Sequence, residues 1–378
     1  MRLGVEVLAF RTKKAGVARY LGNMLARMID IDPRLEVFLY SPSEVEVPLR
    51  AGSYHLRVKR RALFGSGTVW VQSCLPEMLD EDRIDVFWAQ NHSLPIRSPR
   101  RCSRLLTLHD VTALVCPGTM RLRHSAISRL MLPKVVKSAD HIVAVSEATA
   151  ALARTLLGVP YERLSVIGEG VDDGFSAMSV GQARGVLQQA FGIDDDFMLA
   201  VGTVEPRKDY MVLLEALRRL DSVPQLVIAG GLGWRYAETL SQIRILEQSA
   251  RVRYLGAVSD FDLRALYSAA TLSVYPSRYE GFGLPVLEAM TCGCPTICSY
   301  SSSLPEVGGD AVAYFRPGDT GNLAAVISSV LATAERRRVM ATAGIRQSSQ
   351  FGFRAAAEKL LHLLSVLPFR RPLGAERS

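Results

Sequence analysis

Long apolar runs, cysteine and histidine are all scarce in this sequence. Its 378 residues include six cysteines and six histidines, and no apolar stretch approaches the roughly 20 residues of a membrane-spanning helix. The shortage of cysteine excludes a disulfide framework, and Cys292 and Cys294 have no partner nearby at the spacing of zinc ligands. The first residues lack the apolar core and cleavage site of a signal peptide, so we expect a cytoplasmic protein whose chain starts with a strand.

Positive charge is what the sequence has in excess. The formal net charge is +8 and the isoelectric point is about 9.3, which favours an anionic partner. The excess gathers in the first half, around residues 57–61, 97–104 and 121–137. This half could face an anionic membrane surface or a lipid phosphate, and solvated helix faces that happen to be basic are the alternative. We do not expect nucleic-acid binding, because neither an RNA-binding motif with stacking aromatics nor a helix-turn-helix pattern is present.

Short apolar runs alternate with amphipathic stretches along the whole chain, which predicts βαβ units around parallel sheets. The length exceeds what one hydrophobic core supports, so we expect two domains. The predicted strands cover residues 3–9, 35–40, 84–88, 105–108, 141–145 and 164–167 in the first half, and 197–201, 225–229, 252–255, 272–275, 296–298 and 312–315 in the second. Helices are expected at 17–28, 146–157 and 353–367.

A loop rich in glycine, aspartate and serine separates the two halves, and an acidic turn follows it at residues 194–196. We therefore expect a Rossmann-like domain over residues 1–172, a linker region over 173–196 and a second Rossmann-like domain over 197–350. A helix at 351–367 is expected to cross back to the first domain, ahead of a disordered tail at 368–378. Open α/β sheets bind ligands beyond the carboxyl ends of their strands, so two doubly wound domains facing each other would enclose a central cleft.

Two segments of the second half carry residues suited to an anionic ligand. In VGTVEPRKDY, Arg207 and Lys208 lie between a strand end and a helix start, where backbone amides and two cations suit a diphosphate. In PSRYEGFGLPVLE, a glycine-rich turn has Glu280 before it and Glu288 after it. A carboxylate in such a position can accept hydrogen bonds from ribose hydroxyls. The plain structural alternative is a basic helix cap and two solvent-facing carboxylates.

At these motifs the chain resembles the retaining glycosyltransferases of family four, which adopt the GT-B fold. Glu280 and Glu288 have the spacing of that family's paired glutamates. Further stretches that resemble the family are KAGVARYLGNML, HIVAVSEATAALARTLLGVPYERLSVI and SSSLPEVGGDAVAYFRPGD. The pattern of VGTVEPRKDY, the pair Gly233-Trp234 and SRYEGFGLP is similar to the mannosyltransferases of the family.

The resemblance implies a role for each matching residue. Arg207 and Lys208 would bind the donor diphosphate, Glu280 the sugar hydroxyls and Glu288 the ribose. Backbone amides near Phe282, Gly283 and Leu284 would meet the sugar and the phosphates, Gly16 and Arg19 would lie in the first loop beside the phosphates or the acceptor, and His109 would contact the transferring sugar. Two positions depart from the family pattern: Ala15 replaces a second glycine, and IGEGVD at 167–172 replaces the usual proline and asparagine turn.

The implied reaction moves a hexose from a nucleotide diphosphate, with GDP-mannose as the expected donor, to a hydroxyl of a glycan or lipid-linked saccharide. It would retain the anomeric configuration and need no metal or other cofactor, and it would serve O-antigen or lipopolysaccharide synthesis at the inner face of the cytoplasmic membrane. A UDP-sugar donor and a nucleotide-sugar epimerase of the same fold are alternatives. A metal-dependent transferase using Asp30 and Asp32 is a third, which we disfavour because the pair precedes Pro33 in a helix-to-strand loop, away from the carboxyl ends of strands.

Overall fold

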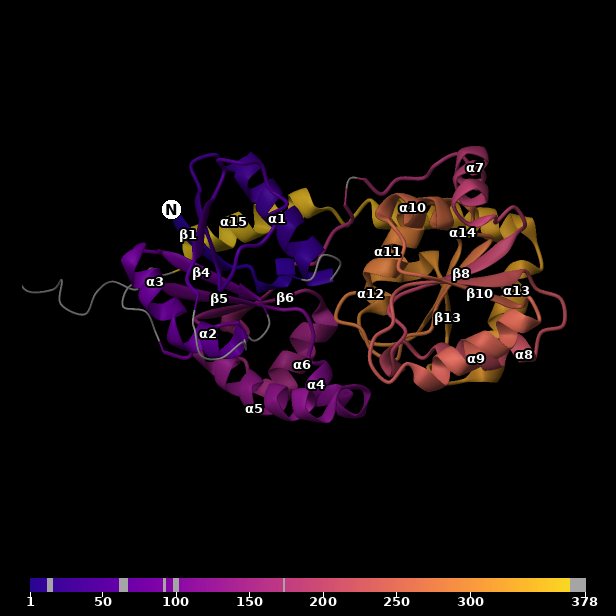
Figure 1. Cartoon of the computed structure of the whole chain (residues 1–378), viewed down its shortest axis with the longest axis horizontal. Helices are drawn as coiled ribbons and strands as arrows, with labels where there is room; N and C mark the ends of the chain where they lie inside the picture. Colours follow the sequence, from indigo (N-terminus) through magenta and orange to yellow (C-terminus); the bar gives the residue numbers. More distant parts are fainter. Residues whose placement is uncertain (12–15, 61–66, 91–92, 98–101, 173, 368–378) are drawn as a thin grey trace, which may run out of the picture. The chain divides into compact units, whose positions relative to one another are not determined.

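Two parallel β-sheets, each with helices on both faces, organise the chain (Figure 1). The computed structural model describes residues 1–11, 16–60, 67–90, 93–97, 102–172 and 174–367. Each sheet is the centre of one unit. Unit 1 comprises Met1–Val115, Arg123–Gly170 and Gly352–Ser378, and unit 2 comprises Cys116–Leu122 and Val171–Phe351.

The sheet of unit 1 has the strand order β3-β2-β1-β4-β5-β6-β7, with every pair parallel. Its strands are β1 (Arg2–Glu6), β2 (Glu36–Ser41), β3 (His55–Val58), β4 (Val86–Gln90), β5 (Ser103–Leu108), β6 (His141–Ala144) and β7 (Leu164–Val166). All residues of β4 and β5 are buried, as expected of central strands covered on both faces. The order reverses between β1 and β4, and open sheets bind ligands beyond the carboxyl ends of strands at such a switch point.

Helices α1 (Gly16–Ile31) and α15 (Phe353–Val366) lie side by side on one face of this sheet (Figure 1). Apolar residues recur at helical spacing in both, and Leu21 and Met24 of α1 share a buried core with Leu360 of α15. The other helices of the unit are α2 (Gly67–Ser73), α3 (Leu75–Glu81), α4 (Thr112–Val115), α5 (Leu122–Ser138) and α6 (Glu147–Leu157). Ser146 caps α6 by accepting the Thr149 N–H at 3.0 Å, which is why the helix begins where it does.

The sheet of unit 2 has the equivalent strand order, β10-β9-β8-β11-β12-β13, again parallel throughout. Its strands are β8 (Phe197–Val201), β9 (Gln225–Ala229), β10 (Val252–Gly256), β11 (Leu272–Tyr275), β12 (Thr296–Ser299) and β13 (Ala313–Phe315). The switch point of this sheet lies between β8 and β11.

Two buried cores flank the sheet of unit 2. One contains residues of α8 (Tyr210–Arg218), α9 (Ala237–Gln248) and α13 (Thr320–Leu331), and the other contains residues of α7 (Val180–Phe191), α10 (Asp260–Ala269) and α11 (Leu284–Thr291). The unit also holds α12 (Leu304–Gly308) and α14 (Ala334–Ser348). Among all the residues described in either unit, no helix combines the length and apolar character needed to cross a membrane.

The structure differs from the sequence-based expectation in three places. The strand predicted over 3–9 ends at Glu6, because the Glu6 carboxylate accepts the Leu8 N–H at 2.5 Å and the chain turns into a 3-10 helix, Leu8–Arg11. Strand β3 was not predicted, since it is a short edge strand with partly exposed residues. The segment 173–196, expected as a linker region, contains α7, whose Ala183 and Leu187 are buried in the core of unit 2.

Candidate functional site

The candidate residues of unit 2 follow β8 and β11, the two neighbouring strands that flank its switch point. Directly after β8 the backbone turns at Gly202, with φ +144°, and the Tyr210 hydroxyl donates to the Gly202 carbonyl at 2.8 Å. Gly230 packs against this turn so closely that a Cβ would lie 2.1 Å from the Gly202 carbonyl oxygen. Only glycine fits there, and the loop that carries Arg207 and Lys208 is thereby fixed against β9.

Glu280 is the centre of a buried polar cluster. Its Oε1 accepts hydrogen bonds from Lys208 Nζ at 2.7 Å, Tyr275 Oη at 2.8 Å and Ser277 Oγ at 2.5 Å. Its Oε2 lies 2.7 Å from Arg207 Nη1. Burial alone would raise the pKa of this carboxyl, but the charges of Arg207 and Lys208 outweigh burial and lower the pKa to about 2. Glu280 is therefore ionised at neutral pH.

Arg207 and Lys208 belong to a short 3-10 helix, Pro206–Lys208, that precedes α8. Arg207 donates to the Glu205 carboxylate and to the Tyr279 carbonyl, each at 2.8 Å. Burial acts to lower the pKa of Arg207, but Glu280 and Glu205 outweigh it and raise the pKa. Burial lowers the pKa of Lys208, and Glu280 offsets this only in part. With Glu205 and Glu280, the two cations form a charge-balanced group whose side chains hold one another in place.

The loops after β8 and β11 are tied together by further bonds. Asp209, directly before α8, has the left-handed conformation, with φ +48°, and its carboxylate accepts hydrogen bonds from both Nε and Nη2 of Arg278 at 2.7 and 3.0 Å. The Arg278 N–H also donates to the Arg207 carbonyl at 2.9 Å. Paired N–H donors on one carboxylate give a fixed geometry as well as energy. The two loops of the switch point therefore behave as one rigid element.

The glycine-rich turn is held by the start of α12. Ser303 Oγ donates to the carbonyls of Glu280 and Phe282, at 3.1 and 2.6 Å. Gly283 adopts φ +120°, and a Cβ at this position would lie 2.7 Å from Leu304 Cδ2. Leu284 then begins α11, with a proline in its first turn as expected. The backbone amides at this helix start are those for which the family resemblance implies contact with the sugar and phosphates.

Glu288 lies one turn into α11 and is 3% exposed. Tyr267 of α10 donates its hydroxyl to Glu288 Oε2 at 3.2 Å. Burial, followed by the charge of Glu288, raises the pKa of Tyr267 well above its ordinary value. Glu280 contacts Arg207, Lys208, Tyr275 and Ser277, whereas Glu288 contacts Tyr267, so the paired glutamates occupy two different environments.

His109 belongs to unit 1, where it follows β5. Its Nδ1 lies 3.0 Å from Glu169 Oε1 and its Nε2 lies 2.8 Å from Gln90 Oε1. All three side chains are buried, and the ring of Tyr20 meets the imidazole edge-on at 4.7 Å between centroids. The structure thus groups His109 with residues at the switch point of unit 1.

The other predicted positions of unit 1 are at the start and end of α1. Gly16 is exposed at its first residue, Arg19 is half-buried in its first turn, and Ala15 lies outside the described residues. Asp30 lies 3.5 Å from Arg27 and Asp32 lies 3.2 Å from Arg34, so each carboxylate pairs with a local arginine. No group of three or more metal-binding side chains gathers within the described ranges of the chain.

Several residues of these clusters were not singled out from the sequence. They are Tyr275, Ser277 and Glu205 in unit 2 and Gln90 and Glu169 in unit 1. Tyr275 and Gln90 are the last residues of their strands, so a search of strand ends could have found them. Glu6 also ends a strand, and burial raises the pKa of its carboxyl to about 7. Glu169 falls in the IGEGVD segment, whose signal in the sequence is its departure from the family pattern.

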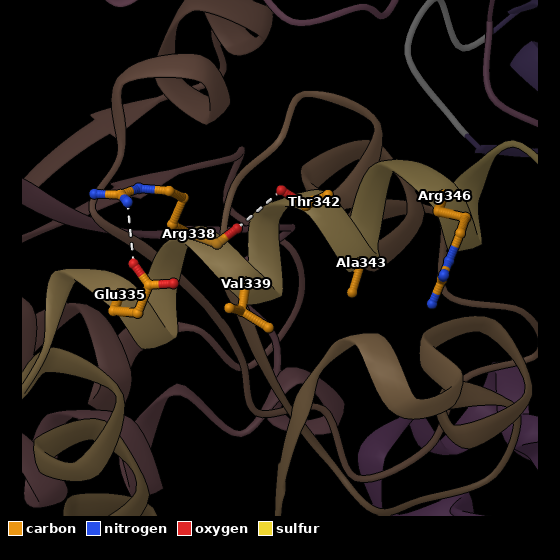
Figure 2. Close-up of a pocket in the computed structure, with 6 residues that line it drawn as sticks. All are labelled: Glu335, Arg338, Val339, Thr342, Ala343 and Arg346. Carbon is orange, nitrogen blue, oxygen red and sulfur yellow. Dashed lines mark hydrogen bonds and ion pairs between the residues drawn. The ribbon is translucent and has the colours of Figure 1, made fainter.

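A hollow of about 360 Å³ lies elsewhere, along α14 (Figure 2). Its lining residues are Glu335, Arg338, Val339, Thr342, Ala343 and Arg346. All of them come from one helix, and Arg338 is paired with Glu335 at 3.0 Å. The hollow shares no residue with either cluster, and we assign it no function.

The chain is similar to known proteins in both of its units. Two family models match the chain, "Glycosyltransferase Family 4" over residues 15–175 and "Glycosyl transferases group 1" over 187–347. The O-antigen chain mannosyltransferase B of Escherichia coli is 32% identical over 289 residues, which are 75% of this chain and 74% of that protein.

Two solved structures show the same fold over nearly the whole chain. Sucrose-phosphate synthase from Thermosynechococcus elongatus aligns with a TM-score of 0.78 and 18% identity, covering 97% of this chain and 98% of that one. Anabaena Alr3699/HepE, in complex with UDP and glucose, aligns with a TM-score of 0.76 and 20% identity, covering 97% and 99%.

Proposed function

The chain belongs to glycosyltransferase family 4, and from that premise we propose that it transfers mannose from GDP-mannose to a hydroxyl of a glycan or lipid-linked saccharide. Its fold is GT-B, with two Rossmann-like parallel-sheet domains. The product would be part of a bacterial surface polysaccharide such as O antigen. Support for mannose and for the pathway comes from the 32% identity to a protein named for both.

The observation that carries the proposal is the cluster of Arg207, Lys208 and Glu280 at the switch point of unit 2. An ammonium group has three hydrogens, and Tyr275 and Glu280 take two of those of Lys208 among the described residues. The third can meet a phosphate oxygen. Arg207 lies beside it on the same loop, so both cations suit a leaving group that is a nucleoside diphosphate.

Glu280 suits a sugar hydroxyl through its second oxygen. A carboxylate offers about four lone-pair sites, and Oε1 already accepts from three donors while Oε2 faces Arg207 alone among the described residues. A hydroxyl of the hexose can therefore donate to Oε2. With Glu288 as the proposed acceptor for the ribose hydroxyls, the two glutamates would hold opposite ends of the donor.

The proposed chemistry breaks the bond between the anomeric carbon and the diphosphate oxygen while the acceptor oxygen bonds to the same face of the sugar. The acceptor proton passes to the departing phosphate, so the configuration is retained without an enzymatic nucleophile. Arg207, Lys208 and the amides at the start of α11 stabilise the charge that develops on the phosphate. This scheme requires no divalent metal, because fixed cations and amides stabilise the charge on the leaving phosphate in its place.

The test is a comparison of four donors with the purified protein: GDP-mannose, UDP-glucose, UDP-N-acetylglucosamine and dTDP-rhamnose. Thermal stabilisation by each donor reports binding to the native state, and release of nucleotide diphosphate reports turnover. We expect GDP-mannose to exceed the others clearly, since a polar site rejects ligands that leave its groups unpaired. A preference for a UDP sugar would overturn mannose as the substrate, and conversion of a donor into an isomeric nucleotide sugar, with no new glycosidic bond, would indicate an epimerase.

We further propose that the basic face of α5 brings the enzyme to the anionic inner face of the cytoplasmic membrane. The sequence of α5 contains no acidic residue. Lys134 and Lys137 are exposed on it, together with Ile127 at 57% and Leu130 at 63% exposure. Cations near an anionic surface contribute about 1 kcal/mol each, and exposed apolar side chains can enter the headgroup region.

Co-sedimentation with vesicles tests this surface. Binding to vesicles with anionic lipid should fall with salt, and Lys134→Gln with Lys137→Gln should weaken it by about 10- to 30-fold, following the same per-cation energy. The matched control is Lys359→Gln, which removes an exposed charge from α15. Binding that ignores salt, lipid charge and these substitutions would defeat the proposal.

A further inference from the structure

Three buried polar side chains form a line at the carboxyl edge of the sheet in unit 1. Gln90 ends β4, His109 follows the neighbouring β5, and Glu169 follows β7. Their exposed fractions are 3%, 7% and 7%. Gln90 is also beside the switch point, where β4 meets β1. Buried polar groups need partners, and here Nδ1 of His109 lies within hydrogen-bond distance of Glu169 and Nε2 within that distance of Gln90.

Counting donors and acceptors shows which nitrogen of His109 carries a fixed proton. An ionised carboxylate only accepts, so the 3.0 Å contact with Glu169 requires a proton on Nδ1. Gln90 can present either end of its amide: its oxygen meets a protonated Nε2, and its NH₂ group meets a neutral Nε2. As placed, the Gln90 NH₂ group is buried with no partner among the described residues. In both arrangements Nδ1 donates to Glu169, and only Nε2 can change partner.

The backbone that carries Glu169 is fixed in place by the residue that follows it. A Cβ on Gly170 would lie 2.3 Å from the Phe353 nitrogen and 2.7 Å from the Gly352 carbonyl carbon. The backbone after Glu169 is therefore pressed against the start of α15, and Phe353 in turn contacts the ring of Tyr20. Since Tyr20 also packs edge-on against the imidazole, the ring and its carboxylate are held by the same core.

We propose that Glu169 is a positioning residue for the transfer reaction. It holds His109 in the tautomer with a proton on Nδ1, so that Nε2 is the nitrogen that can exchange Gln90 for a hydroxyl of the substrate. The buried negative charge beside Nδ1 also makes Nε2 a stronger acceptor for that hydroxyl. This inference rests on the proposed function, because the hydroxyl belongs to a sugar substrate.

A double-mutant cycle of Glu169→Gln and His109→Asn tests the proposal. Gln keeps the shape of Glu169 and removes its charge, and Asn keeps a donor near the position of Nδ1. We expect Glu169→Gln to lower kcat by about 10- to 100-fold, as misplaced reacting groups do, with little change in the donor KM. In the His109→Asn background the same substitution should cost no further turnover, because Glu169 acts through His109. Glu162→Gln, on an exposed carboxylate of the same unit, is the control.

Nitrogen NMR of histidine-labelled protein gives a readout that does not depend on turnover. The His109 signals, assigned by their loss in His109→Asn, should show the proton on Nδ1 in the wild type and a shift of the proton to Nε2 in Glu169→Gln. Thermal unfolding tests whether each variant folds. Glu169→Asp keeps the charge, so its kcat should fall less than that of Glu169→Gln.

The outcomes separate this inference from the proposed function. A wild-type His109 with its proton on Nε2 would overturn the role of Glu169 without affecting the proposed function. A loss of kcat from Glu169→Gln in the His109→Asn background as large as in the wild type would do the same. Absence of turnover with every donor would overturn the proposed function, and the NMR result would then decide whether Glu169 sets the tautomer.

Discussion

Replacing Lys208 should reveal two separate contributions, one to folding and one to turnover. Lys208 Nζ lies 2.7 Å from Glu280 Oε1 inside unit 2, and removing one partner of a buried ion pair costs about 3–5 kcal/mol. Arg207 remains 2.7 Å from the other oxygen of Glu280, so we expect the lower end for Lys208→Ala, about 3 kcal/mol. For a domain of this size that corresponds to a fall in Tm of roughly 6–12 °C.

The effect on turnover has a different origin. In the proposed reaction the leaving diphosphate gains charge in the transition state, and Lys208 faces that charge from a fixed position. Removing one comparable donor costs on the order of 100-fold or more in kcat, which is about 3 kcal/mol of transition-state stabilisation. The donor KM should change less than kcat, because the interaction strengthens during the reaction.

A comparison of a single variant with a charge-balanced double variant separates the two effects. Lys208→Met alone leaves Glu280 with one cation, whereas Lys208→Met with Glu280→Gln leaves no excess buried charge. We expect the double variant to recover most of the lost Tm, since buried ion pairs can be replaced by neutral groups at little cost. It should not recover kcat, because both proposed donor contacts are lost.

Thermal melts and steady-state kinetics on the wild type and these three variants test both effects. A Lys208→Ala protein with near-normal kcat would remove this residue from the mechanism. Recovery of kcat along with Tm in the double variant would show that the single substitution acted through folding alone. A single variant as stable as the wild type would contradict the magnitude worked out for the buried pair.

The remaining predictions concern the donor, the metal and pH. Glu288→Ala should raise the donor KM by about 10- to 100-fold through loss of a hydrogen bond to a charged group, and Tyr267→Phe should raise it less; an unchanged KM would contradict the ribose role. Turnover should persist in EDTA, and a loss that magnesium or manganese restores would favour a metal-dependent reaction. Burial raises the folded-state pKa of Glu6 from 4.5 to about 7, so its contribution to stability is present below pH 4.5 and is lost as the pH rises to 7. The free energy of unfolding of Glu6→Gln, relative to that of the wild type, should therefore rise by about 3 kcal/mol between pH 4 and 8. A difference in unfolding free energy that does not change with pH would refute the pKa shift.

Much of the fold could be predicted from the sequence because its central strands are nearly continuous apolar runs. Strands such as β4 and β8 are buried on both faces of a parallel sheet, and this produces the strongest hydrophobic signal. The prediction was wrong for β3, where only partial burial on a sheet edge weakens that signal. It was also wrong at the end of β1, because a side-chain acceptor, Glu6, turns an apolar stretch away from the sheet.

The site was predictable where its residues share a local motif and not where long-range packing brings them together. Arg207 and Lys208 are adjacent in sequence, and the glycine-rich turn marks Glu280. The residues that complete each cluster come from other loops: Glu169 lies 60 positions from His109 in the sequence. Their proximity depends on strand order and on the packing of Gly170, neither of which leaves a periodic pattern.

The two units share one strand topology but carry polar clusters of different composition. Each sheet has its switch point between the first and the fourth of its strands in sequence, β1 and β4 in unit 1 and β8 and β11 in unit 2, and each carries its polar cluster beside that point. In unit 2 the cluster contains two cations and two carboxylates. It suits an anionic ligand that can replace a carboxylate as the partner of the cations. In unit 1 it contains an imidazole between a carboxylate and an amide, which can exchange a proton or a neutral hydroxyl but offers no fixed excess of positive charge. The unit 1 cluster is therefore suited to hydroxyl groups. If the donor phosphate binds at unit 2, substitutions in the unit 1 cluster should alter kcat more than the affinity for the nucleotide.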